Sequence, residues 1–351
     1  MNLKIDNVEV IPVSIPLKKP MYMSGRCITH AENILIKIAA GGITGWGEAA
    51  SAPRMTGDTV PGMIEVVTKF LRPLLVGKMT NDYRHLSTQV LKTVYGNTGA
   101  KSAVNGALLD LISRIQNIPM YELLGTKQTS TLNSMRILGN KTQEEDIAEA
   151  QAAYNNGVDF FKIKVGKHSI DKEIEQTYRI RNVIGNSKLC VDANAGLSES
   201  ALHIYVNAVK DFNLLFLEQP FDSMIKLDLN IPICMDESIF TKEDLHLVKS
   251  TGAGQGVNLK TIKLGGPIQL VEAALVADQL GLEINISAKV AETGIATSTM
   301  LHCAAVSPNL NWGLSTTNQY LIQDIIKAPK TNVLEAVEVD EYLLKQFRYD
   351  V

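Results

Sequence analysis

Lysine and carboxylate side chains stand at the carboxyl ends of successive short apolar runs in the second half of the chain. In chain order they are Lys162 and Lys164, Asp192, Glu218, Asp236 and Lys260. Carboxylates can hold a cation, and a lysine beside a cation can take up and return a proton. The set therefore predicts a site that binds a cation and transfers a proton.

The three carboxylates indicate a metal site. Asp192, Glu218 and Asp236 follow three successive apolar runs, and like charges brought together repel unless a cation binds them. All the donors are oxygen, which suits a hard cation such as Mg²⁺, and no cysteine or histidine joins the set, which disfavours zinc. We expect these residues to ligate Mg²⁺; each carboxylate taken alone is more often a helix cap.

The lysines supply the acid and base. Lys162 and Lys164 are two residues apart, so on a strand they point the same way. Lys164 and Lys260 fall on the second and sixth of eight runs, opposite each other in a closed barrel. A nearby cation and the ammonium of Lys162 are expected to lower the pKa of a lysine base toward neutrality.

The elements that must position these residues are strands of a parallel barrel. Short apolar runs cover 132–138, 160–166, 188–196, 214–220, 231–238, 256–266, 282–288 and 309–315, and helical stretches such as 144–157 and 243–252 separate them. Eight strands alternating with helices favour a (β/α) barrel, whose active site lies at the carboxyl ends of the strands.

The first part of the chain predicts an α+β domain. Residues 3–17 alternate like a strand, and 32–49 indicate two strands joined by Gly41-Gly42. Amphipathic helices are expected over 63–75, 85–96 and 100–115. We predict an α+β cap over 1–125 and a barrel over 126–318, with 319–351 packing back on the cap.

Composition bounds the function. The net charge of −3 gives no basis for binding nucleic acid or an anionic membrane surface, and no apolar run approaches the roughly 20 residues that span a bilayer. The beginning of the chain lacks the layout of a secretion signal. Four scattered cysteines without a CxxC pair indicate reduced, mostly buried thiols in a cytoplasmic protein.

Five motifs in order, FKIKVG, VDANAG, LEQP, MDES and NLKTIKLGGP, resemble the muconate-lactonising branch of the enolase superfamily. GITGWGEA and the helical stretch that follows also resemble its capping domain, so the likeness covers nearly the whole chain. The branch includes muconate cycloisomerases, o-succinylbenzoate synthases, N-acylamino acid racemases and dipeptide epimerases. The resemblance implies a (β/α)7β barrel, Mg²⁺ and a homo-oligomer, either dimer or octamer.

The resemblance also assigns roles residue by residue. Asp192, Glu218 and Asp236 match the metal ligands, and Lys164 and Lys260 match the acid/base pair. Lys162 matches the lysine that supports the enolate charge. The polar neighbours of the metal site are matched by Asn194 and Glu237.

Three features depart from the family pattern. The segment between Glu218 and Asp236 is short, so the helix there is expected to be trimmed. Strand eight has no Asp-x-Asp, which weakens a dipeptide assignment, and offers Ser315 and its neighbours instead. Strand seven carries ISAKVAE without histidine, which argues against the mandelate-racemase branch. His302 falls on a helical stretch and is expected to be a core or surface residue.

Substrate-binding residues are the least determined. Lys289, just past strand seven, and Arg136, near the end of strand one, either bind a distal substrate anion or remain solvated. Segments 21–25 and 53–58 resemble the two loops that close over the barrel, and place Tyr22 and Met55 near a substrate.

The expected function is racemisation or epimerisation of an N-substituted amino acid or related small-molecule carboxylate. A cycloisomerase or lyase would use the same residues for its first half-reaction, so the sequence leaves that alternative open. A non-catalytic barrel is the alternative from another class of protein. Such a protein would be recognised by the loss of one metal ligand or one lysine of the site, and all of these residues are present.

Overall fold

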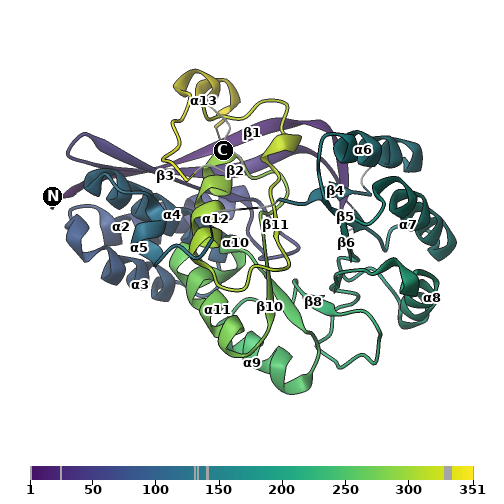
Figure 1. Ribbon diagram of the computed structural model, residues 1–351. Coiled ribbons are helices and arrows are strands. Elements are labelled where there is room, and N and C mark those ends of the chain that lie inside the picture. The colour runs from purple at the N-terminus through teal and green to yellow at the C-terminus, as the bar shows by residue number, and fades with distance from the viewer. Residues whose placement is uncertain are drawn as a thin grey trace.

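The computed structural model describes residues 2–23, 26–129, 132, 134–139, 142–327 and 334–350. Two sheets organise this part of the chain, an antiparallel sheet of three strands and a parallel sheet of eight. Figure 1 shows the cap helices on one side of the molecule and barrel helices α6 (Gln143–Asn155), α7 (Ile170–Ile184) and α8 (Glu199–Val209) on the other.

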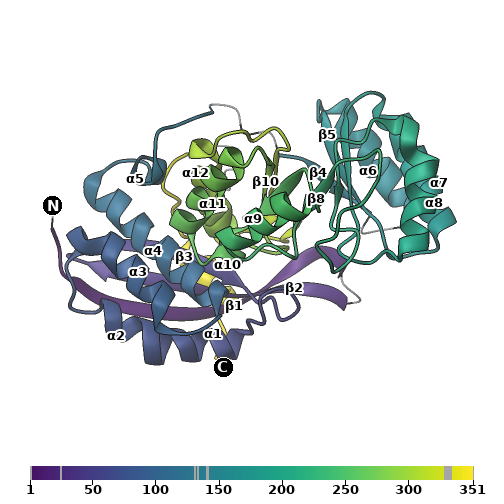
Figure 2. The ribbon, with the colours of Figure 1, turned by 90° about the horizontal axis from the view of Figure 1, so that it is seen from below.

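The antiparallel sheet belongs to the cap. Its strands are β1 (Ile5–Met23), β2 (Arg26–Ala40) and β3 (Ile43–Ala50). Gly41 and Gly42 join β2 to β3 with φ of 55° and 81°, the two positive values that a tight hairpin turn needs. The predicted hairpin is therefore confirmed. Figure 2 shows β1 and β2 running from the cap helices along one side of the barrel.

Helices cover one face of this sheet. They are α1 (Val60–Val66), the π-helical segment η1 (Val67–Leu71), α2 (Arg72–Leu75), the turn η2 (Thr80–Asp82), α3 (Tyr83–Thr93), α4 (Thr98–Gln116) and α5 (Met120–Leu124). α4 lies directly on β3, where a Cβ on Gly47 would stand 2.0 Å from the carbonyl oxygen of Ala103. The helix predicted over 63–75 is interrupted by η1 just before Pro73, which has no N–H to donate.

The parallel sheet is the barrel. Its strands are β4 (Arg136–Leu138), β5 (Phe160–Lys164), β6 (Lys188–Asp192), β7 (Leu217–Glu218), β8 (Ile233–Met235), β9 (Gly256–Leu259), β10 (Glu283–Ser287) and β11 (Leu314–Ser315). They pair in chain order. A parallel bridge between Ser134 and Leu314 closes the circle. The fold is thus the predicted (β/α)7β barrel with an α+β cap.

Helices connect the strands with one exception. In addition to α6, α7 and α8 with its extension η3 (Lys210–Phe212), the connections carry α9 (Lys242–Thr251), α10 (Thr261–Leu264), α11 (Pro267–Gln279) and α12 (Gly294–Val306). Residues 219–232, between β7 and β8, are all described and contain no helix. The trimmed helix expected there is confirmed.

The C-terminal segment returns to the cap strand β1. Leu321, directly after η4 (Asn318–Tyr320), bridges Leu17, and Arg348, directly after α13 (Glu341–Phe347), bridges Val13. Within this segment α13 begins at Glu341, because Asp340 caps a helix there. One apolar cluster joins β1, α12 and this segment. The division at 125 and 318 stays a prediction.

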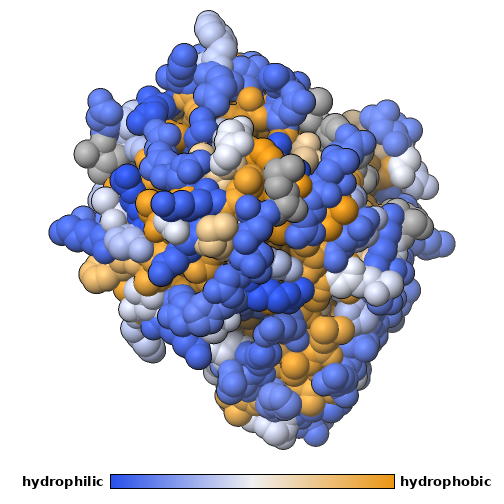
Figure 3. All heavy atoms as spheres, turned by 90° about the vertical axis from the view of Figure 1, so that its left-hand side faces the viewer, coloured by the Kyte–Doolittle hydropathy of each residue, from blue (hydrophilic) through white to orange (hydrophobic). Residues whose placement is uncertain are grey.

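The surface is mixed. The face in Figure 3 combines hydrophilic and hydrophobic residues. Within the described residues, no helix is both long and apolar enough to span a membrane. All four cysteines are free thiols; Cys27 is exposed, and Cys190, Cys234 and Cys303 are buried.

Candidate active site

The predicted lysines and carboxylates meet at the carboxyl ends of β5 to β9. Alternate residues of β5 face opposite ways. Phe161 and Ile163 pack in the outer core beneath the helices, whereas Lys162 donates from inside the barrel to Glu218 at 2.5 Å. Lys164 points the same way and pairs with Asp192. The shared direction of the two lysines is as predicted.

Asn194 links the β5 end to the β8 end. Lys164 Nζ donates to Asn194 Oδ1 at 2.9 Å, and Asn194 Nδ2 donates to Glu237 Oε1 at 3.0 Å. The other oxygen of Glu237, Oε2, is buried and has no hydrogen-bond partner among the described residues. We therefore expect a ligand to donate a hydrogen bond to this buried oxygen.

Asp236 is held by two lysines from one segment. Lys260 follows β9 directly and pairs with Oδ2. Lys263, one turn later in α10, donates to Oδ1 at 2.6 Å and also to the main-chain oxygen of Asp236. The sequence analysis gave Lys263 no role; its spacing of three residues from Lys260 is the signal that could have identified it.

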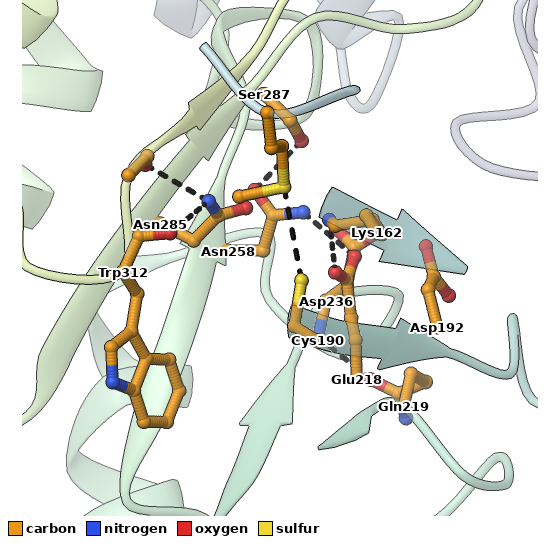
Figure 4. A network of polar contacts seen from close by, with 12 residues as sticks. Lys162, Cys190, Asp192, Glu218, Gln219, Asp236, Asn258, Asn285, Ser287 and Trp312 are labelled. Carbon is orange, nitrogen blue, oxygen red and sulfur yellow. Dashed lines mark hydrogen bonds and ion pairs between the residues drawn. The ribbon is translucent and has the colours of Figure 1, made fainter. Parts of the chain in front are cut away.

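Glu218 is the centre of a second network, shown in Figure 4. Asn258 Nδ2 donates to Glu218 Oε1 at 2.8 Å, and Ser287 Oγ donates to Asn258 Oδ1 at 2.8 Å. With Lys162 on Oε2, both oxygens of Glu218 have partners. Ser287 was not predicted, since a serine inside a strand carries no distinguishing pattern.

Electrostatics couple the three carboxylates. Burial, and then the charges of Asp192 and Asp236, raise the pKa of Glu218 to about 7 against the opposing effect of Lys162. For Asp236, burial alone would raise the pKa, but Lys260 and Lys263 hold it below its ordinary value. The carboxylates are thus close enough to repel one another, as the sequence argument assumed.

The pKa values of Lys162 and Lys260 are raised in this arrangement. Burial by itself would lower the pKa of Lys260, but Asp236 and Glu237 raise it above its ordinary value. Burial would also lower the pKa of Lys162, and Glu218 raises it above the ordinary range. The expected downward shift depends on a bound cation and stays a prediction; in this arrangement Lys162 and Lys260 rest against carboxylates.

The donor atoms of the three carboxylates are of the chemical type that a hard cation prefers. Asp192, Glu218 and Asp236 offer only oxygen, from three adjacent strands. In the described part of the chain, however, no three His, Cys, Asp or Glu side chains gather closely enough to hold a metal ion. The lysine ammonium groups lie on oxygens of these carboxylates instead.

Left-handed backbone shapes two of the strand ends. Asn194, Ala195 and Gln219 have φ of 42°, 59° and 34°, values that side-chain-bearing residues adopt at a cost of about 1–3 kcal/mol each. Asn194 N donates to Asp192 Oδ1 at 2.9 Å, and Ala195 N donates to the carbonyl of Gln219 at 2.8 Å. Such strain typically accompanies a functional site.

Two family models cover this architecture. The model of the mandelate racemase/muconate lactonizing enzyme N-terminal domain matches residues 5–125, and the enolase C-terminal domain-like model matches residues 145–340. The chain belongs to the muconate lactonizing enzyme family of the enolase superfamily. It is accordingly an enzyme.

Named relatives in this superfamily span several reactions. The chain is 29% identical over 319 residues to the L-Ala-D/L-Glu epimerase of Bacillus subtilis, covering 88% of this chain and 87% of that protein. It is 25% identical to the N-succinyl-L-Arg/Lys racemase of Bacillus cereus, over 86% and 84% of the two chains. The structure of the Pseudomonas fluorescens muconate lactonizing enzyme complexed with muconolactone superposes with a TM-score of 0.92 at 25% identity, over 99% and 100% of the chains.

The substrate-binding residues predicted for this family member are only partly brought together. Lys289 and Met55 line one cavity of about 350 Å³ between the cap and the barrel. Ser315 ends β11 beside Ser287, and its buried Oγ has no partner among the described residues. The backbone of Tyr22 belongs to β1, but its side chain lies outside the described part.

Arg136 does not reach the site. It begins β4 in register with Phe161, on the outward side of the barrel, and its Nη1 lies 3.5 Å from Glu149 of α6. The expectation that Arg136 meets a substrate anion is therefore corrected. The run 132–138 suggested a longer strand ending near Arg136, whereas β4 starts at that residue.

Proposed function

We propose that the protein removes the proton α to a substrate carboxylate and returns it to the opposite face, as a racemase or epimerase. Lys164 and Lys260 support this, because they stand at the ends of β5 and β9, four strands apart in a ring of eight. In the reaction one lysine is a neutral amine that takes the α-proton. The other is an ammonium that donates a proton to the same carbon.

Asp192, Glu218 and Asp236 would hold Mg²⁺. When bound, the metal supplies positive charge that favours the enediolate form of the substrate carboxylate. Lys162 adds a fixed ammonium inside the barrel for the same charge. Asn194 and Glu237 orient the neighbouring groups, through the hydrogen bonds that join Lys164 to Asn194 and Asn194 to Glu237.

An N-substituted amino acid, or a related acid without a free α-ammonium, is the substrate class that we propose. β11 and the residues after it offer Ser315, Thr316, Thr317 and Asn318, hydroxyl and amide groups without a carboxylate. A buried ammonium without a charged partner costs several kcal/mol. Met55, Lys289 and Tyr22 complete the proposed substrate contacts.

A cycloisomerase or lyase is the second candidate. The similarity to the muconate lactonizing enzyme structure, at a TM-score of 0.92, favours it. Its first step would use the same lysines. We further propose a homo-oligomer, dimer or octamer, that works in the cytoplasm, where the buried thiols of Cys190, Cys234 and Cys303 stay reduced.

Proton exchange in deuterated water tests the function. A library of N-acylamino acids, hydroxy acids and unsaturated acids is incubated with the protein and Mg²⁺, and the α-proton signal is followed by NMR. Racemisation is expected to give exchange with no other product, whereas loss of a β-substituent or ring formation would favour the second candidate. EDTA is expected to abolish exchange and Mg²⁺ to restore it. Full activity in the metal-free protein would contradict the metal assignment.

A further inference from the structure

The cavity between cap and barrel contains a cation without a partner. It is lined by residues from β2, the 51–55 turn and two strand ends of the barrel, among them His30, Glu32, Met55, Glu237 and Lys289. Within the described chain, the Nζ atom of Lys289 takes part in no hydrogen bond or ion pair; its main-chain N donates to Glu292 at 3.1 Å. An unpaired ammonium at the wall of a cavity is suited to meet a ligand.

Nearby acids compensate the charge of Lys289 only in part, because Glu292 attracts it without forming an ion pair. Burial, and then the charge of Glu48, raise the pKa of Glu292 to about 8, so this neighbour is mostly neutral at pH 7. Glu32 already accepts from Ser14 at 2.5 Å and from Tyr349 at 3.1 Å. Burial lowers the pKa of Lys289 to about 8, which still leaves it mostly protonated at pH 7.

The loop that carries Lys289 is held from the cap. Asn33 of β2 donates through Nδ2 to the carbonyl of Ala291 at 2.8 Å and to Glu48 Oε1 at 2.7 Å. Ala291 has a φ of 74°, which is costly for alanine and persists only where neighbours impose it. The conformation of residues 289–293 thus depends on the cap.

Glu48 of β3 completes this clamp at the beginning of α12. Its Oε1 accepts from Thr293 N at 2.9 Å, and its Oε2 accepts from Thr293 Oγ1 at 2.6 Å and from Ala296 N at 3.0 Å. A carboxylate at a helix N-terminus satisfies main-chain donors that no residue within the helix can reach. Asn33 and Glu48 therefore fix both ends of the short loop that follows Lys289.

We propose that the cavity takes the distal end of the substrate, that this end carries a carboxylate which pairs with Lys289, and that Asn33 and Glu48 are positioning residues for this contact. The proposal rests on the proposed function, since it concerns the same substrate. A cationic end held by Glu237 is the rival occupant, because Glu237 Oε2 also lacks a partner among the described residues.

Matched ligand pairs test the distal group. The first set varies the end of the N-acyl group (the acyl arm) and compares N-succinyl-norvaline with N-pentanoyl-norvaline and N-(4-aminobutanoyl)-norvaline. The second set varies the end of the amino acid side chain (the side-chain arm) and compares N-acetylglutamate with N-acetylglutamine. Calorimetry on the Mg²⁺-loaded protein measures binding, and NMR in deuterated water measures exchange in the same samples. In at least one arm we expect about 10- to 100-fold tighter binding of the carboxylate form.

Variants assign the preference to Lys289. Lys289→Met is expected to remove the preference while binding of the neutral analogue changes less than about threefold, and Lys289→Arg to keep much of it. A preference that survives Lys289→Met, equal binding within both pairs, or tighter binding of the aminobutanoyl compound would overturn the proposal. Selective binding of the carboxylate form without α-proton exchange would support the distal site and refute the proposed function. Exchange without selective binding would support the proposed function and refute the distal site.

Glu48→Gln tests the clamp. The substitution places an amide donor against the donors of Thr293 and Ala296, so we expect weaker binding of the carboxylate form and little change for the neutral analogue. A merely structural role for Glu48 would weaken both ligands equally and would overturn the positioning assignment. Asn33→Ala, which removes the hydrogen bonds to Ala291 and Glu48 and also changes the wall of the cavity, is expected to act in the same direction and supplies a second variant should Glu48→Gln unfold.

Discussion

Lys263 donates to both the side chain and the main chain of Asp236, and both side chains are completely buried. The lysine thereby fixes the conformation at the end of β8, from which Asp236 is expected to contact the metal. Removing one member of a buried ion pair leaves the other without compensation. Lys263 is therefore a positioning residue for Asp236.

Replacement of Lys263 by Met is expected to destabilise the fold by about 3–5 kcal/mol and to weaken Mg²⁺ binding. Urea unfolding and a Mg²⁺ titration measure the two effects. Lys242→Met is the control, because Lys242 pairs with Glu272 at 2.8 Å with both side chains about half exposed, and such surface pairs contribute about 0–1 kcal/mol. Equal unfolding midpoints for the two variants would refute the assignment.

The two lysines of the proposed base pair are expected to serve opposite faces of one carbon. Lys164→Ala should abolish α-proton exchange from one enantiomer of a substrate, and Lys260→Ala from the other. NMR of each pure enantiomer in deuterated water distinguishes them. Lys188→Ala is a control on the exposed beginning of β6. If either active-site variant exchanges both enantiomers at the normal rate, the two-base mechanism is wrong.

Dipeptides are expected to be poor substrates. The residues that end β11 provide no carboxylate for a free ammonium, and Asp58 of the cap segment 53–58 already accepts through Oδ2 from Gly99 N at 2.9 Å. A side-by-side screen of L-Ala-L-Glu-type dipeptides against N-acylamino acids checks this. Efficient turnover of the dipeptides alone would show that another carboxylate, such as Glu292, binds the ammonium.

Acid is expected to destabilise the fold through His302. This histidine is buried, its Nδ1 accepts from Tyr121 N at 3.3 Å, and burial lowers its pKa to about 4. Between pH 6.5 and 4 the unfolded chain binds a proton at this position that the folded chain does not. Stability should therefore fall by about 3 kcal/mol as the pH drops through that window.

Urea unfolding of the wild type and of His302→Gln from pH 7 to pH 4 isolates this contribution. The difference in unfolding free energy between the two proteins should shift in favour of the variant as the pH falls. His246→Gln, at an exposed position of α9, should leave the pH dependence unchanged. Parallel pH profiles for the wild type and His302→Gln would contradict the prediction.

The sequence by itself determined the strands, their order and the polar residues at their ends. The side-chain period of a strand is two, so Lys162 and Lys164 had to share a direction once β5 was recognised. Parallel strands expose their carboxyl ends on one face, which brought Asp192, Glu218 and Asp236 to neighbouring positions. Gly41-Gly42 specified the cap hairpin because only glycine adopts both positive φ values at little cost.

The tertiary structure decided what those groups contact. Arg136 faces α6 because β4 begins there, and a shift of one residue moves a side chain to the other side of a sheet. The lysines rest on carboxylates, and the pKa of Lys260 lies above its ordinary value. Asn33 contacts Ala291 across 258 residues of chain and Glu48 contacts Thr293 across 245. Local periodicity carries no information about such pairs, because they are selected only when the cap packs on the barrel.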